Sequence, residues 1–130
     1  MTITANTPKS DIAGLKSHVS CPVILPGEKH YDLQRHVWNA DIDRNPAAIV
    51  SCRTAEDVSR ALTWSLDNGY EITVRGGGHN LAGTAVIDGA VLLDTGPMKE
   101  VSFDHDAGTV TVGAGCRLGD LDRACADHGV

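Results

Sequence analysis

The sequence predicts an α+β fold, with one strand–helix–strand unit followed by a small, mostly antiparallel section. Two observations support this prediction. A segment with helical spacing of apolar residues lies between two short apolar runs, residues 47–51 and 71–74. Three further short runs then follow without a helix between them. Hydrophobic residues make up 42% of the 130 residues, which is enough for a buried core.

Residues 1–43 are predicted to be a helical and extended lead-in. Residues 10–19 are expected to form a short helix with Ser10 as its N-cap, because a serine oxygen accepts the free amides of a first turn. Residues 28–39 form an amphipathic stretch. At its end we expect Trp38 to serve packing rather than substrate binding.

Residues 44–130 are predicted to form a second unit, incomplete at its C-terminus. Thr54-Ala-Glu-Asp57 resembles a capping box, and apolar residues then recur at helical spacing up to Leu66. Asn68-Gly69 is a typical helix end. The strand that follows leads directly into Arg75-Gly-Gly-Gly-His-Asn80.

The last part of the chain is predicted to hold three strands and a helix. The strands are residues 91–94, 101–104 and 109–112, and the last two are joined by a polar turn that fits a hairpin. The helix is expected over residues 117–127, with Gly129 as its cap. An apolar helix face and a strand edge would then have few partners, so we expect further sequence to complete the domain.

Charge and composition exclude several classes of function. The net charge is −6, and Lys and Arg do not cluster, which argues against binding nucleic acid or an anionic membrane. The start of the chain has no signal-peptide pattern, and no apolar run is long enough for a transmembrane helix, so we expect a cytoplasmic protein. Four cysteines without CxxC spacing favour free thiols over zinc or disulfides.

Three consecutive glycines after a strand need a physical reason, because glycine costs roughly 0.5–1 kcal/mol within an element. Successive N–H groups in such a turn can form a nest for a phosphate, and Arg75 would add charge at its entrance. A tight loop without a ligand is the alternative. His79 follows directly, and taken alone it is a base, a ligand, a nucleophile or an ordinary polar residue.

Other candidate motifs are weaker. The chain has no P-loop signature. Gly113-Ala-Gly115 follows a strand and opens a helix, but Leu118 occupies the third position of a dinucleotide-binding glycine pattern. Asp104-His-Asp106 is more typical of a solvated hairpin tip than of a metal site.

The glycine segment belongs to an ordered series of motifs. The series runs Arg75-Gly-Gly-Gly-His79-Asn80, Ala82-Gly83, Asp88-Gly89, Asp94 and Met98, preceded by a Tyr31 to Asn39 segment of YD...R..WN type. From about Pro26 onward the chain resembles the PCMH-type FAD-binding domain of the vanillyl-alcohol oxidase superfamily. Within this superfamily it looks most like the N-terminal part of berberine-bridge-enzyme-like oxidases. The segment from Asp94 to Met98 departs from the family pattern.

The resemblance implies an FAD-dependent oxidase in which a small organic substrate gives a hydride to the flavin, and oxygen reoxidises it. FAD would be bound covalently through His79, while Arg75 would support the loop. The implied cofactor-binding residues are Arg75, Gly76, Gly77, Gly78, His79, Asn80, Gly83 and Thr84. The family's second flavin-linking cysteine has no match here, and no catalytic base or metal ligand is assigned.

Two other functions stay open at this point: a non-catalytic module that binds a nucleotide or small molecule, and an interaction protein completed by another chain. Because part of the FAD cradle would be missing, we expect these 130 residues alone to bind FAD weakly or not at all. Exposed sheet edges would also favour a homo-oligomer.

Overall fold

A computed structural model describes residues 9–130 and confirms the α+β prediction, with one mixed sheet and one small antiparallel sheet. In chain order the elements are the 3-10 helix η1 (Ile12–Gly14), α1 (Leu15–His18), β1 (Val23–Ile24), α2 (Tyr31–Gln34), β2 (Ala48–Ser51), α3 (Ala55–Asp67), β3 (Ile72–Arg75), β4 (Val91–Asp94), β5 (Val101–Asp104), β6 (Thr109–Val112) and α4 (Leu118–His128).

The main sheet has the strand order β1-β2-β4-β3. Strand β4 lies between β2 and β3 and runs parallel to both, while β1 pairs antiparallel with the outer side of β2. The carboxyl ends of β2, β3 and β4 therefore meet at one edge of the sheet. Ser51, Arg75 and Asp94 occupy that edge in register.

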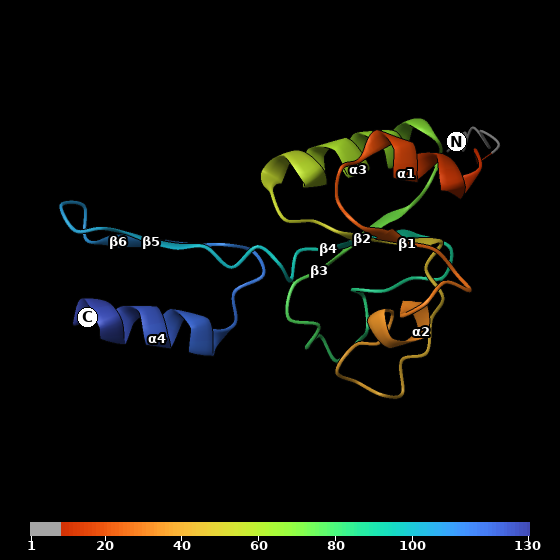
Figure 1. Cartoon of the computed structure of the whole chain (residues 1–130). Helices are drawn as coiled ribbons and strands as arrows, with labels where there is room; N and C mark the ends of the chain where they lie inside the picture. The colour runs from red at the N-terminus through yellow and green to blue at the C-terminus, as the bar shows by residue number, and fades with distance from the viewer. Residues whose placement is uncertain (1–8) are drawn as a thin grey trace, which may run out of the picture.

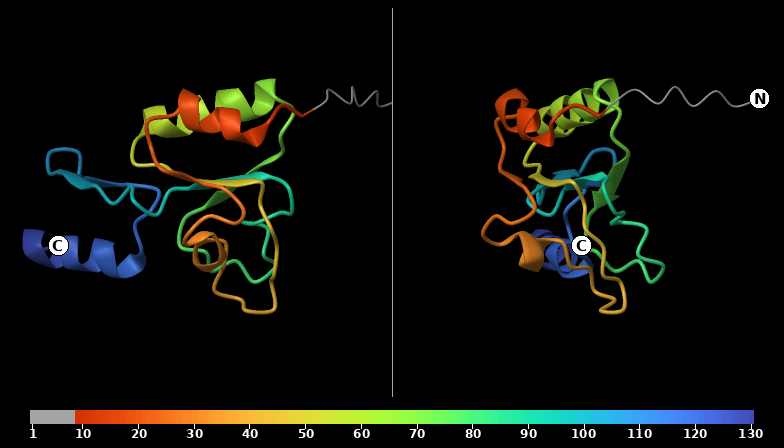
Figure 2. Two further views of the ribbon diagram at one scale, coloured as in Figure 1. Left: turned by 45° about the vertical axis from the view of Figure 1, so that its right-hand side comes forward. Right: turned by 90° about the vertical axis from the view of Figure 1, so that its right-hand side faces the viewer.

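Helices and loops cover both faces of the main sheet. Helices α1 and α3 lie together on one face, and α2 lies on the other (Figures 1 and 2). Side chains of β2 and β4 alternate between the two faces, so Val50 and Leu93 join the core under α3 while Ile49 and Leu92 pack toward α2. All four side chains are buried, which explains why these strands are almost continuously apolar.

The sequence signals around α3 are confirmed. The Thr54 hydroxyl accepts a hydrogen bond from the Asp57 amide at 3.1 Å, and the Asp57 carboxylate accepts one from the Arg53 amide at 2.9 Å. The first bond satisfies an amide of the first turn that lacks a helical partner, and the second holds the residue just before the N-cap. At the other end the chain leaves the helix through Gly69, whose φ of 75° is costly for residues with a side chain.

The lead-in differs from its prediction in two respects. Asp11, not Ser10, caps the first turn, because its carboxylate accepts a hydrogen bond from the Ala13 amide at 3.0 Å. The amphipathic stretch 28–39 is not one helix: only Tyr31–Gln34 is helical. Beyond Arg35 the chain bends toward the glycine loop, where the Trp38 amide donates to the Gly78 carbonyl at 3.0 Å.

The predicted hairpin and final helix are confirmed, and together they form a projecting unit (residues 101–130) to one side of the main sheet (Figure 1). The ring of Phe103 stacks on His128 with centroids 4.1 Å apart, which joins the hairpin to α4. Among the elements of residues 9–130, no helix has the length and apolar character needed to cross a bilayer.

Candidate functional site

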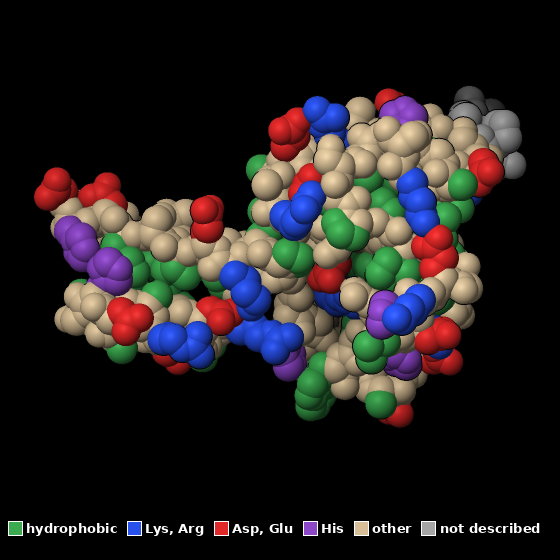
Figure 3. Space-filling view, viewed as in Figure 1, with side chains coloured by type: hydrophobic (Ala, Val, Ile, Leu, Met, Phe, Trp, Pro, Cys, Tyr) green, Lys and Arg blue, Asp and Glu red, His purple; other side chains and the backbone are tan. Residues whose placement is uncertain are grey.

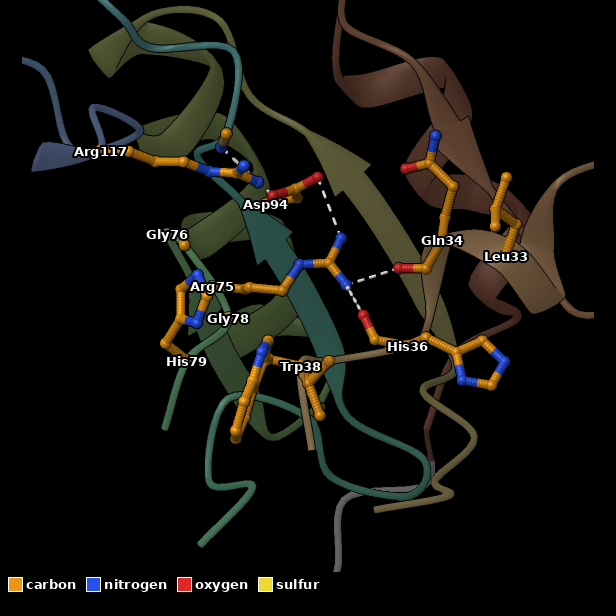
Figure 4. A pocket seen from close by; sticks show the side chains of 13 residues that line it. Leu33, Gln34, His36, Trp38, Arg75, Gly76, Gly78, His79, Asp94 and Arg117 are labelled. Carbon is orange, nitrogen blue, oxygen red and sulfur yellow. Dashed lines mark hydrogen bonds and ion pairs between the residues drawn. The ribbon is translucent and has the colours of Figure 1, made fainter. Parts of the chain in front are cut away.

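The glycine segment begins where β3 ends, at the carboxyl edge of the parallel strands. In open α/β sheets this edge is where ligands bind. A hollow of about 480 Å³ opens there (Figure 4). Its lining comes from four separate parts of the chain: Leu33, Gln34, His36, Val37 and Trp38; Arg75, Gly76, Gly77, Gly78 and His79; Asp94 and Gly96; and Arg117.

Arg75 joins the first three of these parts of the wall. Its guanidinium donates to the Asp94 carboxylate at 3.0 Å, and to the backbone carbonyls of Gln34 at 2.5 Å and His36 at 3.0 Å (Figure 4). The side chain is buried, and its charge is balanced by Asp94. The guanidinium therefore lies within the wall of the hollow and not free at its entrance.

The backbone of the glycine loop offers unused donors. Within residues 9–130, none of the amide N–H groups of residues 76–80 donates a hydrogen bond to a protein acceptor. Each of these five residues has a free donor, and four of them line or border the hollow. Successive free N–H groups at one turn suit an anion such as a phosphate. The loop therefore offers a row of available donors at the place where the sequence predicts an anion nest.

Close backbone approach explains one of the glycines, and a positive φ explains another. A Cβ atom on Gly76 would lie 2.9 Å from the Ala114 carbonyl oxygen, closer than real Cβ contacts allow. Gly78 has a φ of 73°, which L-residues adopt at a cost. These residues let the loop turn sharply while it packs against the segment after β6.

Trp38 does not serve core packing, so that expectation is wrong. Its side chain is 65% exposed and lines the hollow beside the ring of His79, with centroids 6.1 Å apart. The cause is the bond from the Trp38 amide to Gly78, which holds this segment at the mouth of the hollow instead of on the sheet. Exposed His79 and Trp38 thus form one aromatic side of the site.

Arg117 is a site residue that the sequence did not reveal. Gly113 and Gly115 bring it there, because a Cβ atom on either would lie 2.3 Å or less from the carbonyl oxygen of Met98 or Thr95. These glycines therefore serve tight packing, not the weak dinucleotide pattern. Arg117 extends over the hollow (Figure 4). Basic side chains gather where the projecting unit joins the part of the molecule that contains the main sheet (Figure 3).

Three of the predicted cofactor-binding residues lie on the turn just beyond the hollow. The Asn80 carbonyl accepts a hydrogen bond from the Gly83 amide at 3.2 Å, and the Asn80 side chain accepts one from the Thr84 amide at 3.4 Å. Gly83 packs against Ile42. The structure thus brings Arg75 to His79 together in the hollow and places Asn80, Gly83 and Thr84 next to it.

Comparison with known proteins agrees with this geometry. Residues 46–130 match the family described as FAD binding domain. The chain belongs to this family of FAD-linked oxidoreductases, within the vanillyl-alcohol oxidase superfamily. Its relatives of known structure include berberine-bridge-enzyme-like proteins.

Three relatives illustrate the similarity. The chain is 34% identical to (R)-6-hydroxynicotine oxidase of Paenarthrobacter nicotinovorans over 83% of its own length and 24% of the relative. The BBE-like 1 protein of Physcomitrella patens matches with a TM-score of 0.84 and 29% identity, over 92% of this chain and 26% of the other. Glucooligosaccharide oxidase from Acremonium strictum, described with a 6-S-cysteinyl, 8α-N1-histidyl FAD, matches with a TM-score of 0.83 and 28% identity over the same shares.

The chain therefore spans about a quarter of the length of the relatives it matches. The similarity covers the glycine loop and its surroundings.

Two glycines with the same backbone conformation provide a matched test of packing beside the site. Gly83 and Gly89 have φ values of 68° and 71°. A Cβ atom on Gly83 would lie 2.7 Å from Ile42, whereas one on Gly89 meets nothing within 4 Å. Gly89→Ala should cost about 1–2 kcal/mol of unfolding free energy from backbone strain alone. Gly83→Ala should cost at least about 1 kcal/mol more because of overpacking.

Urea denaturation of both variants measures the difference. Adding Ile42→Ala to Gly83→Ala should recover much of the extra loss, while adding it to Gly89→Ala should only lower stability further. Equal losses for the two single variants would contradict the packing argument.

Proposed function

We propose that this chain binds FAD as the cofactor-cradling part of an FAD-dependent oxidase, with the cofactor's pyrophosphate on the glycine loop. The observation that carries the proposal is the row of free amide donors at residues 76–80, on the rim of a hollow built at the carboxyl edge of the sheet. Membership of the FAD-binding family supports the same assignment.

The residues present fit such a group. The amides of Gly76, Gly77, Gly78 and Asn80 would donate to pyrophosphate oxygens, and the absence of side chains on the glycines lets a phosphate approach the backbone closely. Gly83 and Thr84 are proposed as further neighbours of the cofactor on the adjoining turn.

A dianionic pyrophosphate also needs a cation. The charge of Arg75 is already balanced by Asp94 inside the wall. Among the described residues Arg117 makes no ion pair, and its side chain lines the hollow. Arg117 would therefore supply the charge that complements the cofactor, and Arg75 would keep the loop in place.

His79 is proposed as the covalent attachment point of the flavin. Its ring is exposed at the mouth of the hollow, and no described side chain hydrogen-bonds to it. The histidyl-linked FAD of the Acremonium strictum relative supports this role. FAD, when bound, supplies the redox chemistry by accepting a hydride from a small organic substrate and passing electrons to oxygen.

Acid precipitation tests the attachment. In a protein that carries the complete FAD-binding domain, flavin absorbance should remain with the precipitated protein after incubation with FAD, because a covalent bond survives unfolding. In His79→Ala any bound flavin should move to the supernatant. His18→Ala, which changes a histidine outside the hollow, should behave like the unchanged protein. Flavin that stays with precipitated His79→Ala, or that leaves the unchanged protein, would contradict the assignment.

Fluorescence titration with FAD tests the role of Arg117. Arg117→Ala should raise the Kd for FAD by roughly tenfold, about 1.4 kcal/mol, because one charge-assisted contact to phosphate is lost. Arg123→Ala is the matched control, since Arg123 lies on α4, the helix that Arg117 precedes, but outside the hollow. An equal effect of the two substitutions would show that only overall charge matters.

A further inference from the structure

Cys21 and Cys52 face each other at the end of the β1–β2 ladder. The antiparallel register of these strands extends past β1, where the Ser51 amide donates to the Pro22 carbonyl at 2.9 Å. The next pair in that register is Cys21 with Cys52. Because hydrogen-bonded and non-hydrogen-bonded pairs alternate along a ladder, Cys21 and Cys52 fall at a non-hydrogen-bonded position, where Cα atoms are typically about 4.5 Å apart. Cys21 itself lies in a bend two residues before β1.

The two thiols share one buried environment. Both cysteines belong to the core cluster between the sheet and helices α1 and α3. Cys21 is 6% exposed and Cys52 is fully buried, and both are free thiols. Burial raises the pKa of Cys52 to about 12, and the neighbouring Cys21 is the next largest cause of that shift. The side chains therefore lie against each other on the same face of the sheet.

We propose that Cys21 and Cys52 form a redox-responsive dithiol, which hydrogen peroxide converts into a cross-strand disulfide. Disulfides need Cα atoms about 4.4–6.8 Å apart with Cβ atoms facing each other, and a non-hydrogen-bonded pair at the end of this ladder has that geometry. The register of β1 and β2 already brings the two residues toward each other in the reduced protein, so closing the bond requires no change of strand register.

The chemistry requires one peroxide. The thiolate of Cys21, the less buried partner, attacks a peroxide oxygen, forming an S–O bond as the O–O bond breaks and water leaves. The Cys52 sulfur then attacks the sulfenic sulfur of Cys21, forming the S–S bond and releasing a second water. The two sulfurs lose two electrons, and the peroxide gains them. An oxidase that reduces oxygen produces hydrogen peroxide, so a source of peroxide within the protein itself rests on the proposed function. Peroxide added from outside would oxidise the two thiols in the same way.

Access to the pair depends on β1. Burial and the nearby Asp57 carboxylate raise the pKa of Cys21, so its thiol is mostly protonated and reacts slowly in the closed fold. Strand β1 has only two residues and lies at the sheet edge, so local opening there exposes the pair. Oxidation is therefore slow under resting conditions and proceeds when peroxide persists.

The disulfide has a consequence for the hollow. Cys21 and Cys52 lie at the two ends of the chain segment that carries α2 and residues 33–38, which form one wall of the hollow. A bond between them closes this segment into a covalent loop fixed to β2. Peroxide would thereby stabilise the wall that contains Trp38 and the two carbonyls bonded by Arg75.

The test uses the full chain with Cys116→Ser and Cys125→Ser, so that only the proposed pair remains. After treatment with hydrogen peroxide, intact mass should fall by two hydrogen atoms, and non-reducing peptide mapping should recover the peptides of Cys21 and Cys52 joined. Dithiothreitol should reverse both changes. The oxidised form should also unfold at a Tm higher by at least about 5 °C, since the bond closes a loop of more than thirty residues.

Cys52→Ala in the same background is the control and should show neither the linkage nor the Tm rise. Circular dichroism shows whether the double serine variant folds. If it does not, peptide mapping of the peroxide-treated unchanged chain tests whether Cys21 and Cys52 become linked. Recovery of Cys21 and Cys52 as free thiols or as separate oxidised acids would overturn the proposal. So would linkage that appears only in denaturant, or pairing of either cysteine with Cys116 or Cys125.

Discussion

The site depends on the buried ion pair between Arg75 and Asp94 at the ends of β3 and β4. One guanidinium connects two neighbouring strands to the segment after α2 through two further carbonyl bonds. Removing either charge would leave the other buried and uncompensated, which typically costs about 3–5 kcal/mol. The carboxylate also accepts a hydrogen bond from the Gly96 amide at 3.2 Å. The hollow therefore keeps its shape through a polar network that the core alone would not provide.

The glycine loop then contributes its backbone N–H groups to the hollow. Because Arg75 and Asp94 neutralise each other, the loop offers amide donors without a net charge, and the proposed cation is Arg117, more than forty residues later in the chain. Tight packing of Gly113 and Gly115 against residues 95–98 brings that cation to the hollow. The proposed anion site is thus shared between the main sheet and the residue that precedes α4 in the projecting unit.

Local signals explain which features were predictable from the sequence. The strands after Asn68 and the boundaries of α3 follow from caps, glycines and apolar spacing, and most of these elements lie within a residue of their predicted positions. The glycine loop was found because three glycines after a strand are costly without a purpose. Trp38 and Arg117 were missed as site residues because their positions result from long-range backbone contacts, to Gly78 and to residues 95–98. The opposition of Cys21 and Cys52 likewise depends on a strand register that spacing alone does not reveal.

The most direct test of the account is to follow the backbone amides of the glycine loop by ¹H–¹⁵N NMR while FAD is added to the labelled chain. This measurement detects weak binding and assigns it to individual residues. Adding FAD should produce concentration-dependent chemical-shift changes centred on the amides of residues 76–80. ADP should reproduce part of these changes, because its diphosphate matches the pyrophosphate of FAD. Shifts confined to other parts of the chain, with these five amides unchanged, would contradict the claim that the loop is the pyrophosphate site.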